Sequence, residues 1–253
     1  DIGTTTLAVR IIDRASGETL ASASAWNAQA PYGADVISRI KYASRDGGLA
    51  RLTELARTQA RELIAIACGD ANVAHEEIAE ILCAGNTTME HIFAGVSPES
   101  IGRAPYAPAE YFTDGGALAG EAFPNAKIRL VPCVSGYIGG DPVAAVHATG
   151  MAERGGVRLL MDIGTNGELV LGGRDGLLSC SVACGPAFEG AEISCGMRSV
   201  PGAISRVSFA QGEFWYVVIG GGYPKGICGT GIVDALAEML KSGVIDGTGR
   251  LLE

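Results

Sequence analysis

Apolar residues along the chain follow two periods, one typical of strands and one typical of helices. Alternation, or a short continuous apolar run, predicts strands at residues 7–13, 20–26, 78–83, 128–131 and 157–162. Apolar residues at three- and four-residue steps predict helices at residues 35–45, 49–68, 89–94, 142–149 and 232–240. Strands interspersed with helices in this way predict an α/β fold.

Turn and cap residues refine these boundaries. The Ser16-Gly17 turn closes a predicted hairpin at the start of the chain. In the sequence Gly139-Gly140-Asp141-Pro142, we predict Asp141 as the helix N-cap and Pro142 as the first helical residue. Residues 97–125 hold four prolines and a Gly115-Gly116 pair, which predicts a long surface loop or small insertion.

The chain divides into two predicted halves. Its Glu153-Arg154-Gly155-Gly156 sequence offers a hinge-like break after the helix that ends near Thr149. We therefore expect a first lobe at residues 1–150 and a second lobe at residues 151–253. The first residue is Asp1 and the last residues complete no obvious element, so we expect a piece of a longer protein whose second lobe is incomplete at its C-terminus.

One short sequence occurs once in each half. Residues 1–9, DIGTTTLAV, match residues 162–170, DIGTNGELV, at five of nine positions. In each copy an apolar strand would end at the aspartate, turn through glycine and small polar residues, and return as a second strand. Such a turn exposes consecutive backbone N–H groups and short hydroxyls, which are suited to binding an anion.

The two turns predict a polyphosphate site across the hinge between the lobes. The expected phosphate-binding residues are Gly3, Thr4 and Thr5 in the first copy and Gly164, Thr165 and Asn166 in the second. Asp1 and Asp162 would end the preceding strands, and a carboxylate beside phosphates is useful only with a cation between them, most simply Mg²⁺ with its own waters. The alternative is an ordinary Asp-x-Gly hairpin turn that the chain uses twice.

Charge and cysteine usage narrow the class of protein. The chain has 28 acidic and 19 basic residues, a net charge of −9 and no basic run, which argues against a nucleic acid or an anionic membrane as partner. No apolar stretch is long enough to span a membrane and no signal peptide opens the chain, so we expect a cytoplasmic protein. The seven cysteines form no CxxC pair, which predicts reduced, buried thiols rather than disulfides or a metal site.

The repeated motif resembles the two phosphate motifs of the superfamily that contains acetate and sugar kinases, heat-shock chaperones and actin (ASKHA). Within it, further segments resemble the ATP-dependent reductive activators of corrinoid proteins. These segments are residues 32–40, 84–89, 184–191, 196–198, 202–204 and 226–234. The resemblance implies a two-lobed, actin-like α/β ATPase with a ribonuclease H-like fold, truncated at both ends. It also implies that residues 139–145 begin the first connecting helix, where Asp141 helps to position metal or water.

The resemblance further implies a function. Such an activator uses ATP and Mg²⁺ to drive electron transfer to a Co(II) corrinoid protein, which restores the methyl-accepting Co(I) state. The implied partner is a corrinoid protein or a corrinoid-dependent methyltransferase, and the implied assembly is a homodimer. Similar proteins carry an iron–sulfur cluster on a ferredoxin-like segment and complete the adenosine site with a Gly-Gly-Phe-Gly type stretch, and this sequence lacks both. A small-molecule kinase of the same superfamily and a non-catalytic nucleotide-sensing module stay open as alternatives.

Several further residues are candidates for the site. The carboxylates expected to serve metal or hydrolytic water are Asp162, Asp141 and Asp1. Glu189 would lie near the ribose or metal, or would cap a helix. The residues expected at a positive helix end that suits phosphate or ribose are Gly229, Thr230 and Gly231, and the alternative is a glycine turn that leads into a core helix. Residues 86–88 follow a predicted strand, where they would face a ligand or simply form a turn and cap.

Overall fold

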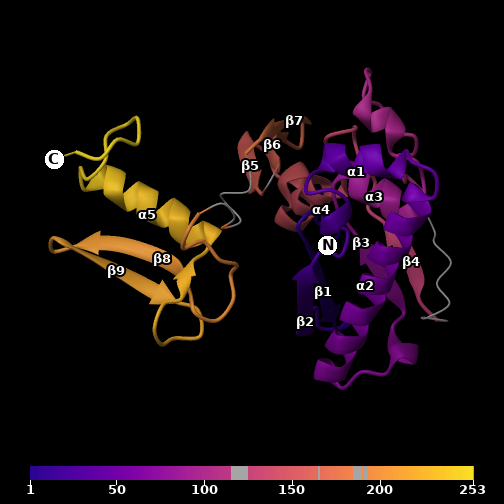
Figure 1. Cartoon of the computed structure of the whole chain (residues 1–253), viewed down its shortest axis with the longest axis horizontal. Coiled ribbons are helices and arrows are strands. Elements are labelled where there is room, and N and C mark those ends of the chain that lie inside the picture. Colours follow the sequence, from indigo (N-terminus) through magenta and orange to yellow (C-terminus); the bar gives the residue numbers. More distant parts are fainter. Residues whose placement is uncertain (115–124, 165, 185–189, 191–192, 253) are drawn as a thin grey trace. The chain divides into compact units, whose positions relative to one another are not determined.

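The computed structural model describes residues 1–114, 125–164, 166–184, 190 and 193–252. It is built of both helices and strands (Figure 1), so the predicted α/β fold is confirmed. The chain forms two compact units: unit 1 comprises residues 1–160 and 168–181, and unit 2 comprises residues 161–167 and 182–253. Within the described ranges, no helix is both long enough and apolar enough to cross a membrane.

Unit 1 begins with the predicted hairpin. Strands β1 (Thr6–Ile12) and β2 (Thr19–Trp26) pair antiparallel, and the long helix α2 (Gly48–Ala71) packs against both. Leu52, Ala56 and Leu63 of α2 recur at helical spacing and are buried in the main core with Leu7 of β1. The sequence therefore identified the hairpin and this helix correctly, because each buries one apolar face against the other.

The remaining elements of unit 1 are short. They are α1 (Val36–Ala43), β3 (Glu80–Cys83), α3 (Thr87–Ala94), β4 (Lys127–Leu130) and α4 (Gly140–Thr149), with 3₁₀ turns at Ala30–Tyr32, His75–Glu77, Glu99–Gly102 and Met151–Glu153. Strands β3 and β4 pair in parallel. Asp35 caps α1, because its carboxylate accepts a hydrogen bond of 2.8 Å from the Ser38 N–H.

The predicted start of α4 is wrong by two residues. Helix α4 begins at Gly140 with Gly139 as its N-cap, so Asp141 lies inside the first turn instead of capping it. A Cβ atom at Gly139 would lie 2.3 Å from the Gly85 carbonyl oxygen, and one at Gly140 would lie 2.2 Å from a carboxyl oxygen of Glu90. The chain enters the helix at these two glycines because no side chain fits between them and the Gly85 turn.

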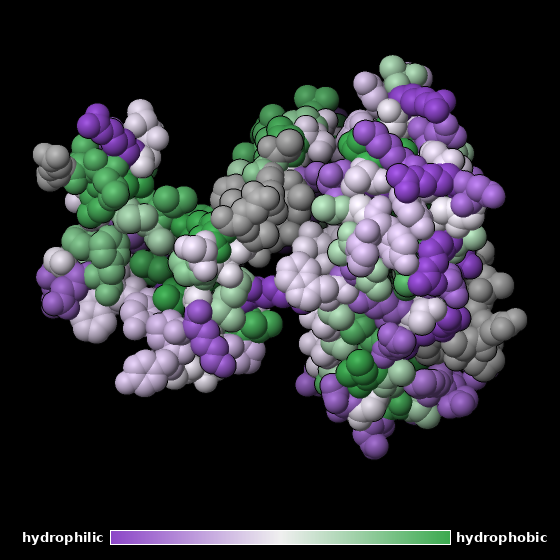
Figure 2. Space-filling view, in the orientation of Figure 1, coloured by the Kyte–Doolittle hydropathy of each residue, from purple (hydrophilic) through white to green (hydrophobic). Residues whose placement is uncertain are grey.

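The second half of the chain holds two further sheets. Strands β5 (Arg158–Ile163), β6 (Asn166–Gly173) and β7 (Gly176–Ala183) form one sheet in that order. In unit 2, β8 (Ala203–Ala210) lies between antiparallel β9 (Glu213–Val218) and parallel β10 (Gly226–Ile227). Helix α5 (Gly229–Lys241) packs on β8, and its exposed apolar residues form a green stripe in Figure 2: Val233, Leu236 and Leu240.

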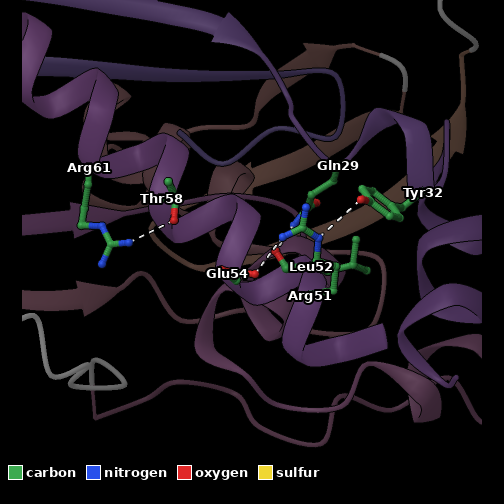
Figure 3. A network of polar contacts seen from close by, with 7 residues as sticks. All are labelled: Gln29, Tyr32, Arg51, Leu52, Glu54, Thr58 and Arg61. Carbon is green, nitrogen blue, oxygen red and sulfur yellow. Dashed lines mark hydrogen bonds and ion pairs between the residues drawn. The ribbon is translucent and has the colours of Figure 1, made fainter. Parts of the chain in front are cut away.

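Polar contacts of α2 fix the segment that leads into α1 (Figure 3). Gln29 donates 2.9 Å to the Leu52 carbonyl, while Arg51 bonds both to the Tyr32 hydroxyl and, at 2.8 Å, to Glu54. Gln29 is fully buried, so its contact to a helix carbonyl positions the chain more firmly than the exposed Arg51–Glu54 pair does.

The cysteine prediction is only partly confirmed. All seven cysteines are free thiols. Four are buried, namely Cys68, Cys83, Cys133 and Cys228, but Cys180 and Cys195 are exposed and Cys184 is half-buried. Three of the seven thiols are therefore at least partly accessible to solvent.

Candidate functional site

The first copy of the repeat forms a closed turn in unit 1. Ile2 forms an antiparallel bridge with Leu7 and a parallel bridge with Gly85, and the Ile2 N–H donates 2.7 Å to the Ala84 carbonyl. The Gly3 N–H then donates 3.0 Å to the Thr6 carbonyl. A Cβ atom at Gly3 would lie 2.5 Å from that same oxygen, so only glycine fits this tight turn.

Three polar side chains from distant segments hold this turn. Asn27 donates 2.8 Å to the Gly3 carbonyl. Arg39 donates 2.5 Å to the Thr4 carbonyl, and the Asn86 amide donates 2.9 Å to the Thr4 hydroxyl. The turn is therefore fixed from β2's end, from α1 and from the start of α3, rather than by its own residues alone.

Arg39 is the most deeply buried of these side chains. It is 1% exposed, and besides Thr4 it donates to the Gly33 carbonyl at 3.0 Å and to the Gln29 side-chain oxygen at 3.2 Å. Burial lowers the pKa of its guanidinium to about 10, against the opposite effect of Asp35. Arg39 thus stays charged at neutral pH, and neutral oxygens satisfy its donors.

Sequence reasoning missed the role of Arg39. Residues 32–40 carry the family resemblance, and the structure shows that they support the turn. A Cβ atom at Gly33 would lie 2.8 Å from the Arg39 backbone nitrogen, which explains the glycine. Arg39 shares the buried face of α1 with Ala43, where an arginine needs fixed acceptors, and this burial is seen only in the structure.

The starts of α3 and α4 meet beside the turn. Asn86 caps α3 by accepting 3.0 Å from the Met89 N–H, as its position after a strand had suggested. The Gly85 carbonyl accepts from the N–H groups of Gly140 at 2.9 Å and Asp141 at 3.3 Å. Thr4 and Asp141, two residues expected in the site, therefore converge on the Gly85-Asn86 turn.

A fully buried carboxyl group and a half-buried one lie together at this junction. Glu90 of α3 is 0% exposed, and burial together with the nearby Asp141 carboxylate raises its pKa to about 9. Backbone hydrogen bonds of Gly85 and Gly140 lower the pKa of Glu90, but by less than burial and Asp141 raise it. Glu90 is therefore protonated at neutral pH. Sequence reasoning missed this pair, because helical spacing does not show that Glu90 faces inward.

The second copy of the repeat is the turn between β5 and β6. The Gly164 N–H donates 3.1 Å to the Asn166 carbonyl, so in both copies the glycine N–H closes the turn. Neither of these two N–H groups is therefore available to a phosphate in this conformation, and phosphate binding by the residues that follow each glycine stays a prediction. Asp162 and Asn166 are half-buried, whereas Thr165 and Glu189 lie outside the described residues.

Cys228 lies at the N-terminus of α5. It holds the N-cap position without a capping hydrogen bond from its side chain, and its sulfur lies 3.3 Å from the Thr230 hydroxyl. Burial opposes ionisation of this thiol, but bonds from Ser199, Thr230 and Gly231 together hold its pKa below the ordinary value. Gly231 packs against β8, where a Cβ atom would lie 2.3 Å from the Ile204 carbonyl oxygen. The structure thus gives Gly231 a packing role, while nucleotide binding by Gly229, Thr230 and Gly231 stays a prediction.

The predicted carboxylates do not form a metal cluster by themselves. Among the residues that the structure describes, no three His, Cys, Asp or Glu side chains are grouped to hold a metal ion. Asp141 lies beside Glu90, whereas the Asp1 side chain is exposed and its amino group donates 2.8 Å to the Ala8 carbonyl. Mg²⁺ is commonly bound by one or two carboxylates plus substrate phosphates, so this arrangement is compatible with a metal that arrives with a nucleotide.

Comparison with known proteins identifies relatives over the whole chain. Residues 1–154 match the family model described as the RACo middle region, and residues 156–253 match the one described as the C-terminal domain of RACo, the ASKHA domain. Corrinoid activation enzyme RamQ of Eubacterium limosum is 36% identical over 259 residues, which cover 100% of this chain and 43% of the relative.

Two further relatives agree with these matches. A Methanosarcina barkeri reductase of a Co(II) methylated amine-specific corrinoid protein is 32% identical over 145 residues, 48% of this chain and 27% of the relative. A solved structure of a reductive activator for corrinoid, iron–sulfur protein superposes with a TM-score of 0.89 at 40% identity, over 99% of this chain and 41% of that one. The chain thus spans less than half the length of these relatives.

Replacing Arg39 should destabilise unit 1 strongly. We expect Arg39→Met to lower the free energy of unfolding by about 3 kcal/mol, because it leaves buried oxygens of Thr4, Gly33 and Gln29 without their donor. Arg39→Lys keeps the charge but not the forked donors, so it should lower the free energy of unfolding by less than Arg39→Met does. Denaturant titration measures both. The control is Arg51→Met at the exposed ion pair with Glu54, and an equal loss in that variant would contradict the role of Arg39.

The buried Glu90 should make stability depend on pH. Its pKa rises from 4.5 in the unfolded chain to about 9 in the folded protein, so folding takes up a proton between these values and stability falls as pH rises through that window. We expect Glu90→Gln to remove this slope and to raise the melting temperature at pH 8.5 by about 5 °C, with little change near pH 4.5. Thermal melts across this range test it, with exposed Glu62→Gln as control; parallel curves for wild type and Glu90→Gln would refute it.

Proposed function

Because this chain belongs to the RACo family, the reductive activators of corrinoid proteins, and carries the ASKHA fold, we propose that it is the nucleotide-handling part of such an activator. In this role it binds and hydrolyses ATP so that an electron can pass to a Co(II) corrinoid protein and restore Co(I). The observation that carries the proposal is the repeated glycine-closed turn, whose first copy is fixed by three polar side chains.

The proposed site uses residues next to each glycine. Thr4 and Thr5 would contact phosphate in the first copy, and Thr165 and Asn166 would do so in the second. Asp141, Asp1 and Asp162 are the proposed carboxylates for Mg²⁺ or for the hydrolytic water. When bound, Mg²⁺ would neutralise phosphate charge, which suits a chain with a net charge of −9. Asp141 is half-buried at the start of α4, beside the protonated Glu90.

The names of the relatives support a corrinoid protein as the partner. Their names specify corrinoid proteins and, in the solved structure, a corrinoid, iron–sulfur protein. We propose a corrinoid protein or a corrinoid-dependent methyltransferase as partner, a homodimer as assembly, and an iron–sulfur cluster carried outside residues 1–253. ATP drives the reduction only as far as its affinity differs between conformations of the activator. In this proposal, the fixed turn of unit 1 contributes to the affinity for ATP in one of these conformations.

Removing Asp162 should abolish hydrolysis without unfolding the protein. We expect Asp162→Ala, made in the longer natural polypeptide, to lower ATP hydrolysis about 100-fold or more, because a carboxylate for metal or water is lost. The melting temperature should change little, since Asp162 is half-buried near a strand end. Release of free phosphate measures turnover, and Asp175→Ala, in the exposed turn between β6 and β7, is the matched control.

The same assay separates the alternatives. Wild-type turnover in Asp162→Ala would exclude this residue from the mechanism. Label transferred from ATP to a metabolite, instead of appearing as free phosphate, would favour a small-molecule kinase. Tight Mg-ATP binding in a calorimetric titration with negligible turnover would favour a nucleotide-sensing module.

A further inference from the structure

Four large exposed side chains lie on two neighbouring segments of unit 1. One segment, residues 103–112, follows the 3₁₀ turn Glu99–Gly102, and the other, residues 132–139, follows β4 and leads into α4. The ring centroids of Tyr106 and Tyr137 are 5.8 Å apart. The Cys133 N–H donates 3.1 Å to the Tyr111 carbonyl, which places Tyr111 next to the segment that holds Val134. We call this surface the tyrosine ridge, and its side chains are Tyr106, 47% exposed, Tyr111, 42%, Val134, 56%, and Tyr137, 41%.

Hydrogen bonds hold the second of these segments in place. Thr87 of α3 is fully buried, and its hydroxyl donates 2.6 Å to the Ser135 carbonyl. The turn that carries Tyr137 is closed by the Val134 N–H, which donates 2.8 Å to the Ile138 carbonyl. A fixed backbone therefore presents this part of the ridge, so that a partner would not have to order a flexible loop when it binds.

Tyr106, on the first segment, has a backbone conformation that residues with side chains rarely adopt. Its φ is +62°, in the left-handed region. The Tyr106 N–H donates 2.6 Å to the Arg103 carbonyl, and a Cβ atom at Gly136 would lie 2.1 Å from the Tyr106 carbonyl oxygen, so the two segments touch here. Glycine would adopt this φ without strain. Because strained conformations cluster at functional sites, a large aromatic side chain at this position indicates a use for its ring.

The charged groups next to the ridge already have partners. The Glu110 carboxylate accepts 2.9 Å from the Tyr111 N–H and 3.0 Å from the Phe112 N–H. Arg103 forms an ion pair of 2.6 Å with Glu99. The ridge itself therefore offers aromatic faces and hydroxyl groups, which are typical of the centre of a protein interface. It fits a partner surface with apolar groups and with hydrogen-bond acceptors for the tyrosine hydroxyls.

The ridge lies close to the proposed nucleotide site. Asp141 lies two residues beyond the second segment, in the first turn of α4. Thr87, which holds that segment, directly follows Asn86, whose amide donates 2.9 Å to the Thr4 hydroxyl. The proposed phosphate turn and the ridge are therefore joined by a short series of hydrogen bonds and covalent bonds.

We infer that the tyrosine ridge is the surface on which the corrinoid protein docks. The inference rests on the proposed function and adds the place where the partner binds. A partner at the ridge would lie next to the residues that are proposed to contact ATP and its metal. ATP can change the affinity for the partner only if the two sites are coupled, and the contacts of Thr87 and Asn86 supply a physical connection for this coupling.

The direction of the chain argues against the residues that directly precede Asp1 as the occupant. Ile2 bridges Gly85 in parallel, so the segment that ends at the Gly3 turn has the direction of β3. The ridge lies beyond the carboxyl ends of β3 and β4, whereas residues directly before Asp1 would lie toward the opposite edge of unit 1. They would therefore leave the ridge uncovered.

The variant Tyr106→Gly separates a docking role from a structural one. In the longer natural polypeptide, we expect the KM for a corrinoid protein that the wild type reduces to rise about tenfold, because an aromatic contact is lost. ATP hydrolysis without the corrinoid protein should keep its wild-type rate. The melting temperature should be unchanged or slightly higher, since glycine relieves the left-handed backbone. The matched control is Gln211→Gly, which relieves a φ of +56° in the exposed turn between β8 and β9 and should leave the KM unchanged.

The outcomes of this experiment distinguish the inference from the proposed function. A wild-type KM in Tyr106→Gly would overturn the inference and leave the proposed function standing. A lower melting temperature together with slower ATP hydrolysis would show that the ring is structural, and would also overturn the inference. A wild-type protein that reduces no corrinoid protein would contradict the proposed function, and the inference with it.

Photo-cross-linking identifies the occupant of the ridge independently of turnover. With p-benzoylphenylalanine in place of Tyr137 in the longer polypeptide, irradiation in the presence of the corrinoid protein should give a product with the summed mass of the two proteins. The same label in place of Tyr216, which is 54% exposed on β9, is the control for non-specific capture and should give far less of it. Cross-links found only within one activator chain, or only between two copies of it, would overturn the inference, since the activator itself would then cover the ridge.

Discussion

The geometry of the first turn depends on one buried cation. The Arg39 guanidinium sits in the core of unit 1 and bonds the Thr4 carbonyl, the Gly33 carbonyl and Gln29 together. The Thr4 and Gly33 carbonyls lie outside the helices and strands, and the third acceptor is the side-chain oxygen of the buried Gln29. An arginine suits this role because its planar fork presents several donors in fixed directions, and the cost of burying it is met by neutral oxygens instead of by a carboxylate. The turn that starts the chain is thus part of the core rather than a surface loop.

The two copies of the repeat share a sequence but are supported differently. In the first, polar side chains of Asn27, Arg39 and Asn86 reach the turn from outside. In the second, the turn joins adjacent strands of a three-stranded sheet, and a Cβ atom at Gly167 would lie 2.4 Å from the Cys184 sulfur. What the copies keep in common is the glycine N–H bonded within the turn. Glycine here serves the shape of the turn.

Periodicity predicted most of the elements, and close contact decided what it missed. The β1–β2 hairpin and helix α2 were found because each presents a regular apolar face that packs against the other, and α5 was found from a regular apolar stripe whose residues Val233, Leu236 and Leu240 are exposed. The start of α4 was misplaced because Asp141 and Pro142 fit the local rules for a cap, whereas the contact of Gly139 with Gly85, 54 positions earlier, determined the outcome. Arg39 and Glu90 were missed for the same reason. A charged residue on a helix looks solvated in sequence, and only tertiary packing shows that its face points inward.

The position of the site follows from strand direction. The extended Asp1–Ile2 segment and β3 run in parallel, as do β3 and β4, so all three end at the same edge of unit 1. Each then turns into a different segment: the Gly3 turn, the Gly85-Asn86 turn into α3, and the loop that leads to Gly139 and α4. These three segments meet through the Gly85 carbonyl and the Asn86 amide. Ligands of open α/β sheets bind where the carboxyl ends of the strands meet, and here the topology also brings the N-termini of α3 and α4 to that edge. The turn that we propose to bind phosphate therefore needs no special segment of its own, because the parallel strands bring its partners to it.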